Sequence, residues 1–299
     1  MAAASTYRPA YPEHLRVDVE RYLESLTFSG EAASAGLEEA MRYSLLAGGK
    51  RIRPVLALAT ADALRRDPAS VLPLAAAIEL IHTYSLIHDD LPAMDDDDLR
   101  RGRPTCHRAF GEDVAILAGD GLYAEAFRHL LSEQRGDPAN VLVAARELAA
   151  ATGVQGMVGG QYLDVAGTAP PGPDGLRRLH ELKTGRLIGA SIECVLLLAG
   201  VDQQDTILPF RAFASELGVL FQIVDDILDV TGSPETLGKQ QGSDERLGKR
   251  TYVTEFGLAG ARKLADESHS RARSALHQAA PVGAAELEQI TDFIATRSY

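Results

Sequence analysis

The chain has 299 residues, of which 45% are hydrophobic and 24% are charged, and its formal net charge is −12. This composition is typical of a globular protein with a sizeable core, and it excludes wholesale disorder. The acidic balance excludes nucleic acid as a partner, because such binding depends on Lys and Arg side chains that neutralise phosphates. A phosphorylated small molecule would need local basic residues or a divalent cation.

No run of eighteen uninterrupted apolar residues is present, and the best apolar stretch, Leu187–Gly200, is interrupted by Glu193. We therefore expect no spanning helix and no stable membrane insertion. The first residues show no basic segment followed by an apolar one, so we expect no secretion signal. Cys106 and Cys194 have no metal-ligand spacing, and two reduced thiols predict a cytoplasmic protein.

The distribution of proline predicts an all-helical protein. Proline is costly inside a helix, and it is absent from five intervals of helix length: 13–53, 105–137, 139–169, 174–208 and 235–280. Apolar residues recur within them at helical spacing. Since no Gly-rich linker and no repeat divides the chain, we predict a single all-α domain over residues 1–299, a bundle of ten or more helices.

The first basic group lies at a predicted junction between two helices. Gly48 and Gly49 indicate a helix C-cap, and Pro54 indicates the start of the next helix. Lys50 and Arg53, three residues apart, can project on one side of this junction. Taken alone, the pattern favours a solubilising surface patch.

The segment Leu72–His88 is apolar on all sides, which predicts a helix at the centre of the bundle. Asp89 and Asp90 follow at its end. Pro92 then disrupts helical hydrogen bonding, and we expect a short non-helical insertion that returns Asp95 to the position of a one-turn spacing.

Residues 88–103 contain six aspartates and three arginines. Carboxylates that can hold a cation thus stand beside guanidiniums that can bind phosphate oxygens in a bidentate manner. An EF-hand loop beginning at Asp95 is excluded, because it would need Gly and Glu where the chain has Arg100 and Cys106. A phosphate-binding loop is also excluded, since Lys50 is followed by Arg51.

Lys183-Thr184-Gly185 interrupts a predicted helix between His180 and Leu196. The glycine suggests a kink that frees backbone carbonyls into a cavity, although a merely tolerated glycine is nearly as good a reading.

A second acidic cluster follows in Gln222-Ile-Val-Asp225-Asp226-Ile-Leu-Asp229. At 100° per residue the three aspartates lie at about 0°, 100° and 40° on a helix, so they share one face with Gln222 one turn before. A solvated acidic face is the alternative, but the apolar surroundings favour a divalent cation that relieves the repulsion. Lys239 and Lys249, in the following loop, can fold over this cluster, although such lysines are usually only solvated.

Two metal-binding acidic clusters, a basic group and an apolar helical body have one economical interpretation. Metal ions between facing helices would clamp a diphosphate, and an apolar tail would extend along the bundle. Such a site would ionise the diphosphate ester and shield the carbocation from water.

These motifs resemble the short-chain trans-polyprenyl diphosphate synthase family over nearly the whole chain. The matching segments are Gly49-Lys50-Arg51-Ile52-Arg53-Pro54, Asp89-Asp90-(x4)-Asp95 with Arg100-Arg101-Gly102, Lys183-Thr184-Gly185, and Asp225-Asp226-Ile227-Leu228-Asp229 followed by Gly238-Lys239 and Gly248-Lys249. The resemblance implies the isoprenoid synthase fold around a central substrate cavity, a homodimer, and a cluster of three Mg²⁺ ions for which Mn²⁺ is a possible substitute. The implied reaction is head-to-tail 1′-4 condensation of isopentenyl diphosphate with dimethylallyl or geranyl diphosphate.

The resemblance also implies a role for each matching residue. The metal ligands would be Asp89, Asp90, Asp95 and Asp225, with Asp226 and Asp229 acting through water. The allylic diphosphate would contact Arg100, Lys183 and Lys239, with Lys249 nearby. The diphosphate of isopentenyl diphosphate would contact Lys50, Arg53, His82 and Arg101. The carbocation would be lined by Lys183, Thr184 and Gln222, and the departing diphosphate would take the proton.

Product length depends on the residues just before the first acidic motif, which form the floor of the tail cavity in this family. Here they are Tyr84 and Ser85, and the bulk of Tyr84 favours a C15 product over C20. The Pro92-Ala93 insertion resembles the bacterial farnesyl-type enzymes. The chain ends in Arg297-Ser298-Tyr299, whereas many relatives end in a basic residue that closes over the isopentenyl diphosphate site.

Four alternatives remain. A geranylgeranyl diphosphate synthase would use the same chemistry with a deeper pocket. A terpene cyclase would not need Lys50 and Arg53 for a second diphosphate. An HD-type metal phosphohydrolase, suggested by His88-Asp89, would need further His and Asp ligands. A non-catalytic partner subunit would be expected to lack one acidic cluster, and this chain has both.

Overall fold

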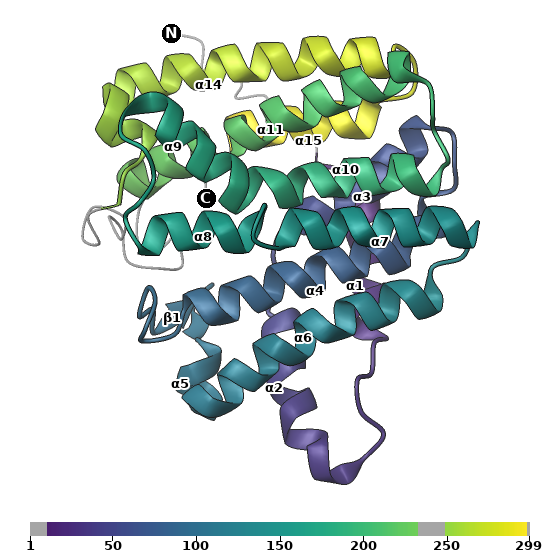
Figure 1. Cartoon of the computed structure of the whole chain (residues 1–299), viewed down its shortest axis with the longest axis vertical. Coiled ribbons are helices and arrows are strands. Elements are labelled where there is room, and N and C mark those ends of the chain that lie inside the picture. Colours follow the sequence, from purple (N-terminus) through teal and green to yellow (C-terminus); the bar gives the residue numbers. More distant parts are fainter. Residues whose placement is uncertain (1–10, 233–248, 298–299) are drawn as a thin grey trace, which may run out of the picture.

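The computed structural model describes residues 11–232 and 249–297 (Figure 1). Within these ranges the long elements are all helical, which confirms the predicted fold class. The helices are α1 (Glu13–Glu24), α2 (Ala35–Leu45), α3 (Ile52–Ala63), α4 (Leu72–Asp89), α5 (Cys106–Phe110), α6 (Glu112–Glu133), α7 (Pro138–Thr152), α8 (Met157–Val165), α9 (Gly172–His180), α10 (Arg186–Leu198), α11 (Gln204–Thr231), α14 (Tyr252–Ala279) and α15 (Ala285–Thr296).

Three shorter helical segments connect these elements. Two are 3-10 helices, η1 (Ala32–Ser34) and η2 (Pro68–Val71), and the third is a π-helix, η3 (Glu181–Gly185), between α9 and α10. Lys239 lies outside the described residues, so its predicted role has no structural counterpart here.

Helix α4 runs through the middle of the bundle (Figure 1). It packs along α6 and against α3, while α10 packs along α7 and α11 along α14. In α4, most residues from Leu74 to Ile81 are fully buried, as the apolar sequence predicted. Burial of each large aliphatic side chain contributes about 1.5–3 kcal/mol, so this helix anchors the core and fixes the position of the acidic motif at its end.

The only strands in the described residues form a ribbon, β1 (Leu99–Arg100) and β2 (Arg103–Pro104), in which Arg100 pairs with Arg103. The two loop residues both have positive φ, 53° at Arg101 and 73° at Gly102. This combination is typical of a type I′ hairpin turn. The ribbon was not foreseen, and it places the arginines that follow the first acidic motif on a tight turn.

Pro209 lies inside α11, in its second turn. The proline-free intervals therefore placed one helix boundary wrongly. A proline this close to the helix N-terminus leaves only one carbonyl without its usual partner, and the helix continues through it.

By length and composition alone, three stretches are apolar enough to cross a membrane: Pro68–Asp89, Pro138–Val165 and Gln204–Thr231. This measure counts only length and composition, so the expectation that no helix spans a membrane stays a prediction. A helix at the centre of a bundle needs apolar residues on all sides, as a spanning helix does, and 61% of the most apolar window of Pro68–Asp89 is buried inside the protein.

Candidate active site

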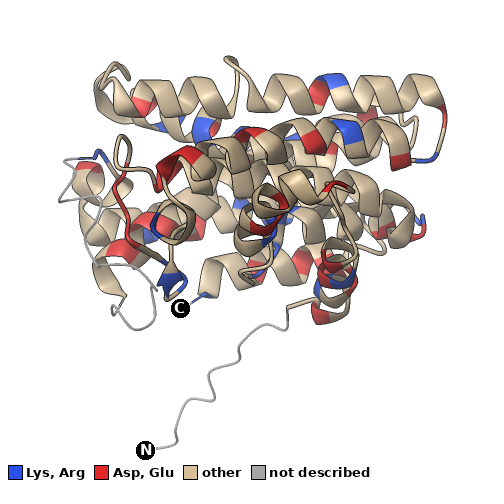
Figure 2. Ribbon diagram, turned by 90° about the horizontal axis from the view of Figure 1, so that it is seen from below, with Lys and Arg blue, Asp and Glu red and all other residues tan. Residues whose placement is uncertain are grey.

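A cavity of about 1470 Å³, hereafter the central cavity, is bordered by α3, α4, α8, η3, α11 and the ends of α14 and α15. Both acidic clusters border it, through Asp89 and Asp95 on one side and through Asp225 and Asp229 on the other. Figure 2 shows acidic and basic segments lying close together near the C-terminal end of the chain. The structure thus brings together the two clusters that the sequence separates by more than a hundred residues.

In the first acidic cluster, Asp89 and Asp95 border the central cavity, whereas Asp90 does not. Asp89 accepts a hydrogen bond from Gln161 Nε2 at 2.7 Å, and Asp95 accepts one from Lys249 Nζ at 2.8 Å. Burial raises the pKa of Asp89 to about 6, and the opposing field of Lys183 does not cancel this rise. Both carboxylates border the central cavity and can present oxygen atoms to a cation.

Asp90 points elsewhere. It is 3% exposed, it does not border the central cavity, and both of its oxygens accept hydrogen bonds from Arg100 Nε, at 2.9 and 2.8 Å. Burial raises the pKa of Asp90 although Arg100 opposes the change. Asp90 therefore binds Arg100, which borders the central cavity, and it is not placed to be the direct metal ligand that the sequence resemblance implied.

The aspartates of the second acidic cluster also differ in their burial and their partners. Asp226 is buried, and its two oxygens accept hydrogen bonds from Gln222 Nε2 and from the backbone N–H of Tyr252, both at 2.7 Å. Asp226 thus ties α11 to the start of α14. Asp225 is more exposed and pairs with Arg297 Nη2 at 3.2 Å, so it is the carboxylate of this cluster that faces the cavity most openly.

The expected kink at Lys183-Thr184-Gly185 is present as the π-helix η3. Two glycines make room for it. A Cβ at Gly160 would lie 2.3 Å from the backbone nitrogen of Lys183, and one at Gly218 would lie 3.0 Å from Cα of Gly185. The wider turn brings Lys183 to 2.6 Å from Asp164.

Next to this ion pair, Thr184 Oγ1 donates to Gln222 Oε1 at 3.2 Å. Thr184, Gln222 and Asp226 therefore form one hydrogen-bonded chain from η3 to α11, and all three border the central cavity.

The basic group of the helix junction borders the same cavity, so the interpretation as a solubilising patch is wrong for Arg53. Arg53 Nη1 lies 3.3 Å from Nε2 of His82, and its guanidinium stands over the ring of Phe221. Burial lowers the pKa of Arg53 to about 10 and that of His82 well below its usual value. Lys50, Arg53, His82 and Arg101 all border the central cavity, and together they form the partly buried basic group to which the sequence resemblance assigns anion binding, hereafter the anion site.

The hairpin places Arg101 beside this junction. Its guanidinium donates to the carbonyl of Gly48, and a Cβ at Gly49 would lie 2.7 Å from the same guanidinium. A side chain at Gly49 would have to displace this guanidinium, and the φ of 124° at this position also favours glycine.

The apolar end of the central cavity lies along α4, below Asp89. The ring of Tyr84 packs edge-on against His88 and Tyr123, with centroids 4.9 and 5.1 Å apart, and Ser85 borders the cavity beside it. His88 is directed toward α6, because its Nε2 lies 3.1 Å from the carbonyl oxygen of Ile116. This contact gives no support to an HD-type site at His88-Asp89.

No three carboxylate, imidazole or thiol groups of the described residues lie close enough to hold one metal ion. The reason is that three of the carboxylates form ion pairs within the protein: Asp90 with Arg100, Asp95 with Lys249, and Asp225 with Arg297. Mg²⁺ commonly takes only one or two carboxylates and completes its shell with water and substrate phosphate oxygens. Paired carboxylates on opposite walls of one cavity fit that kind of site.

Sequence reasoning missed several residues of the cavity: Gln161, Asp164, His180 and Arg250. Gln161 and Asp164 lie three residues apart on α8, a spacing that puts them on one helix face. That spacing after Gly159-Gly160 was an available signal. His180 gave none, because a single histidine on an amphipathic helix is not distinctive.

A helical bundle with two opposed acidic clusters and a separate buried anion site defines a class of protein that handles two anionic substrates in one apolar cavity. The polyprenyl synthetase family profile matches residues 34–292, and the chain belongs to this family.

Individual relatives agree with this assignment. The chain is 46% identical over 285 residues to the farnesyl diphosphate synthase of Geobacillus stearothermophilus, a match that covers 94% of this chain and 93% of that one. It is 45% identical over 264 residues to a chloroplastic geranylgeranyl pyrophosphate synthase of Capsicum annuum, covering 87% and 71%. Among solved structures, a Helicobacter pylori geranyltransferase complexed with magnesium and isoprenyl diphosphate superposes with a TM-score of 0.84 at 32% identity, over 99% of both chains.

Proposed function

We propose that the protein condenses isopentenyl diphosphate with dimethylallyl and then geranyl diphosphate, head to tail, to give farnesyl diphosphate. The observation that carries the proposal is the layout of the central cavity. Two acidic clusters border it from α4 and α11, the basic group Lys50, Arg53, His82 and Arg101 borders it as well, and the ring of Tyr84, packed on Tyr123, borders it on α4 before Asp89. The similarity to farnesyl diphosphate synthases over most of the chain supports the same conclusion.

The donor set fits Mg²⁺, because carboxylate oxygens on opposite walls can share a diphosphate with hard cations. Asp89 and Asp95 would hold ions on the α4 side and Asp225 on the α11 side, with Asp229 acting through water and Asp226 supporting Gln222. When bound, Mg²⁺ neutralises charge on the diphosphate leaving group. Three ions, and Mn²⁺ as a substitute, remain expectations from the family resemblance.

The residues of the chain divide the remaining work. Lys183, Lys249 and Arg100 border the acidic side of the cavity and can each bind oxygens of the allylic diphosphate. Thr184 and Gln222 present oxygen dipoles that stabilise positive charge beside them. The apolar wall around Tyr84 excludes water from the cation, and the leaving diphosphate is the base that takes the proton.

A C20 product is the second candidate, favoured by the similarity to geranylgeranyl pyrophosphate synthases at 45% identity. The chemistry would be the same. We favour C15 because the bulky ring of Tyr84, packed against Tyr123, borders the cavity about one turn and a half along α4 from Asp89 and can block a longer chain.

We also propose a cytoplasmic homodimer. Large apolar side chains are exposed on three neighbouring helices, as is typical of an interface between subunits. They are Ile116, Leu117 and Leu131 on α6, Leu142 on α7, and Val158, Tyr162 and Val165 on α8. Sedimentation of the protein at micromolar concentration tests this, and a monomer would contradict it. Cys106 and Cys194 are both free and buried, in keeping with a reducing compartment.

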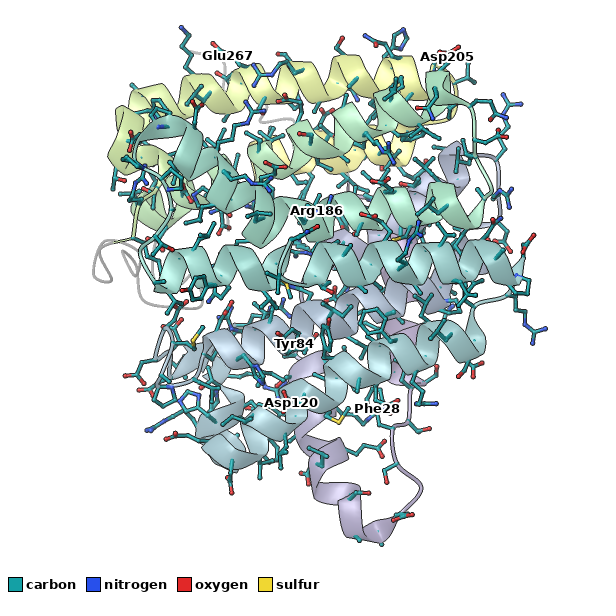
Figure 3. The ribbon with its side chains drawn as sticks, viewed as in Figure 1. Phe28, Tyr84, Asp120, Arg186, Asp205 and Glu267 are labelled. Atoms are coloured by element: carbon teal, nitrogen blue, oxygen red, sulfur yellow. The ribbon has the colours of Figure 1, made fainter. Side chains whose placement is uncertain are left out.

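The function is tested with labelled isopentenyl diphosphate and each allylic starter, with and without Mg²⁺, followed by chromatography of the dephosphorylated products. Asp89→Asn and Asp225→Asn should each lower kcat/KM by at least about a hundredfold, because each removes a cation ligand. Asp205→Asn is the matched control, since Asp205 lies at the far end of α11 (Figure 3). An absence of Mg²⁺-dependent incorporation by the unmodified protein would contradict the proposal.

A further inference from the structure

Arg51 stands in the sequence between Lys50 and Arg53, two residues of the anion site, and its side chain is bound by other parts of the protein. Its backbone is left-handed, with φ 53° and ψ 39°, and it forms the N-cap of α3. Such a conformation costs a non-glycine residue about 1 kcal/mol or more and persists only where surrounding contacts impose it. The left-handed turn sends the side chain of Arg51 inward, where it is 3% exposed. Arg51 borders the central cavity together with Lys50 and Arg53, but its guanidinium is taken up by contacts within the protein.

The guanidinium of Arg51 is fully engaged by three different elements. Nε donates to Glu20 of α1 at 2.9 Å, Nη1 donates to Glu79 of α4 at 2.7 Å, and Nη2 donates to the carbonyl oxygen of Leu45 at 2.7 Å, at the end of α2. Glu79 is itself only 2% exposed. A single side chain thus joins the ends of α2 and α3 to the first and fourth helices.

Glu79 lies directly below the anion site. It is on α4, one turn before His82, and its charge raises the pKa values of Arg53 and Arg101, although burial lowers both. The carboxylate that holds Arg51 therefore also lies near the two guanidiniums that border the cavity. A shift of Glu79 or of the Arg51 backbone would displace Lys50 and Arg53 together.

We infer that Arg51 is a positioning residue for the second anion site: its buried contacts with Glu20, Glu79 and Leu45 hold the left-handed turn that aims Lys50 and Arg53 at the diphosphate of isopentenyl diphosphate. This inference rests on the proposed function for the identity of the diphosphate. In this role the guanidinium of Arg51 stays bound to Glu20, Glu79 and Leu45, and it acts on the diphosphate through its two neighbours.

The substitution Arg51→Lys tests this directly. Lysine keeps the positive charge, but its single ammonium cannot reproduce the planar fork that reaches three elements at once. The anion site contains no metal-binding aspartate, so binding of isopentenyl diphosphate can be measured by calorimetry in EDTA, apart from catalysis. Arg51→Lys should weaken this binding about tenfold, while the KM for the allylic diphosphate changes less than about twofold.

The matched control is Arg42→Lys. Arg42 also ties helices together through backbone carbonyls, with Nη2 3.1 Å from the carbonyl oxygen of Glu24, but it does not border the central cavity. This variant should bind isopentenyl diphosphate as the unmodified protein does. If Arg51→Lys lowers the melting temperature and leaves the dissociation constant unchanged, Arg51 is only structural and the inference is overturned. An equal loss at both diphosphate sites would overturn it too.

Should Arg51→Lys not fold, Glu20→Gln replaces it. Glu20 is at the partly exposed end of the contacts, and the amide keeps an acceptor for Arg51 without the charge. We expect about threefold weaker binding of isopentenyl diphosphate, and unchanged binding would overturn the inference. Failure of the proposed function looks different: the unmodified protein would then give no Mg²⁺-dependent product, whatever its variants bind.

Discussion

Lys249 Nζ lies 2.8 Å from Asp95 Oδ1, although 154 residues separate the two in the chain. Both side chains are about one-fifth exposed, at 20% and 23%. The contact joins the first acidic cluster to the segment that leads into α14. A cation that binds Asp95 Oδ1 would compete with this ammonium, and Lys249 borders the cavity in which we propose that the diphosphate binds.

We therefore expect Lys249→Met to raise the KM for the allylic diphosphate about tenfold, because one charge-assisted contact is lost. The KM for isopentenyl diphosphate should stay within about twofold. Steady-state kinetics with each substrate varied in turn measures both values. Lys263→Met, at an exposed lysine of α14, is the control. Equal changes for the two substrates would show that Lys249 acts on the fold and not on the allylic site.

Tyr84→Ala should lengthen the product from C15 to C20. Each further isoprene unit buries about five carbons, worth roughly 4 kcal/mol, so the chain extends wherever space permits. The Tyr84 ring lies inside the bundle (Figure 3) and is braced by Tyr123. Chromatography of the dephosphorylated products gives the answer. Tyr123→Phe keeps the second ring and should still give C15, and a C15 product from Tyr84→Ala would show that the floor lies elsewhere.

Gly160→Ala should impair both stability and catalysis. The added Cβ would lie 2.3 Å from the nitrogen and 2.6 Å from Cα of Lys183, so η3 must move. We expect a loss of about 1–3 kcal/mol in the free energy of unfolding, together with a lower kcat. Gly189→Ala is the control, since nothing lies within 4 Å of its Cβ and alanine favours the helix by about 1 kcal/mol. Urea unfolding and the product assay separate the two variants, and an unaffected Gly160→Ala would contradict the tight packing.

His180 predicts a pH dependence of stability. Burial lowers the pKa of this imidazole from 6.5 to about 4, and the attraction of Asp164 does not offset it. Between these values the unfolded chain binds a proton that the folded chain does not, so this group makes stability fall as the pH falls. The loss reaches roughly 2 kcal/mol at pH 5 and about 3 kcal/mol at pH 4, at 1.36 kcal/mol per pKa unit.

The comparison with His180→Phe isolates this contribution. Phenylalanine preserves the stacking on Tyr252, whose ring centroid lies 5.5 Å away, and it does not titrate. Urea unfolding of both proteins at pH 7 and pH 5 measures the effect. The variant should lose about 2 kcal/mol less than the unmodified protein, and carboxylates common to both cancel in the difference. Parallel losses would mean that His180 is already accessible to protons in the folded state.

Helical periodicity and proline placement were sufficient to predict the central position of α4 and the acidic face of α11, because both depend on local sequence. They could not predict the start of α11, where Pro209 is tolerated within the helix. The β1–β2 ribbon was missed for a similar reason. Its turn requires positive φ at Arg101, and arginine gives no signal for that conformation.

The sequence predicted where the acidic clusters lie, but it could not predict the hydrogen-bond partner of each carboxylate. Spacing placed Asp225, Asp226 and Asp229 on one face, but the backbone N–H of Tyr252 occupies an oxygen of Asp226, which still borders the cavity. Arg100 does the same to Asp90. Both partners come from other elements of the fold, so no local pattern could reveal which carboxylates remain available to a cation.

Tyr84 and Asp89 belong to the same helix, α4, and five residues of rise separate them by about 7.5 Å. The distance between bond cleavage and the blocked end is therefore set by covalent geometry and does not depend on how neighbouring helices shift. One substitution along α4 can move that end by a discrete step and leave the carboxylates where they were. Lineages built on this scaffold could thus diversify their products without reinventing the reaction.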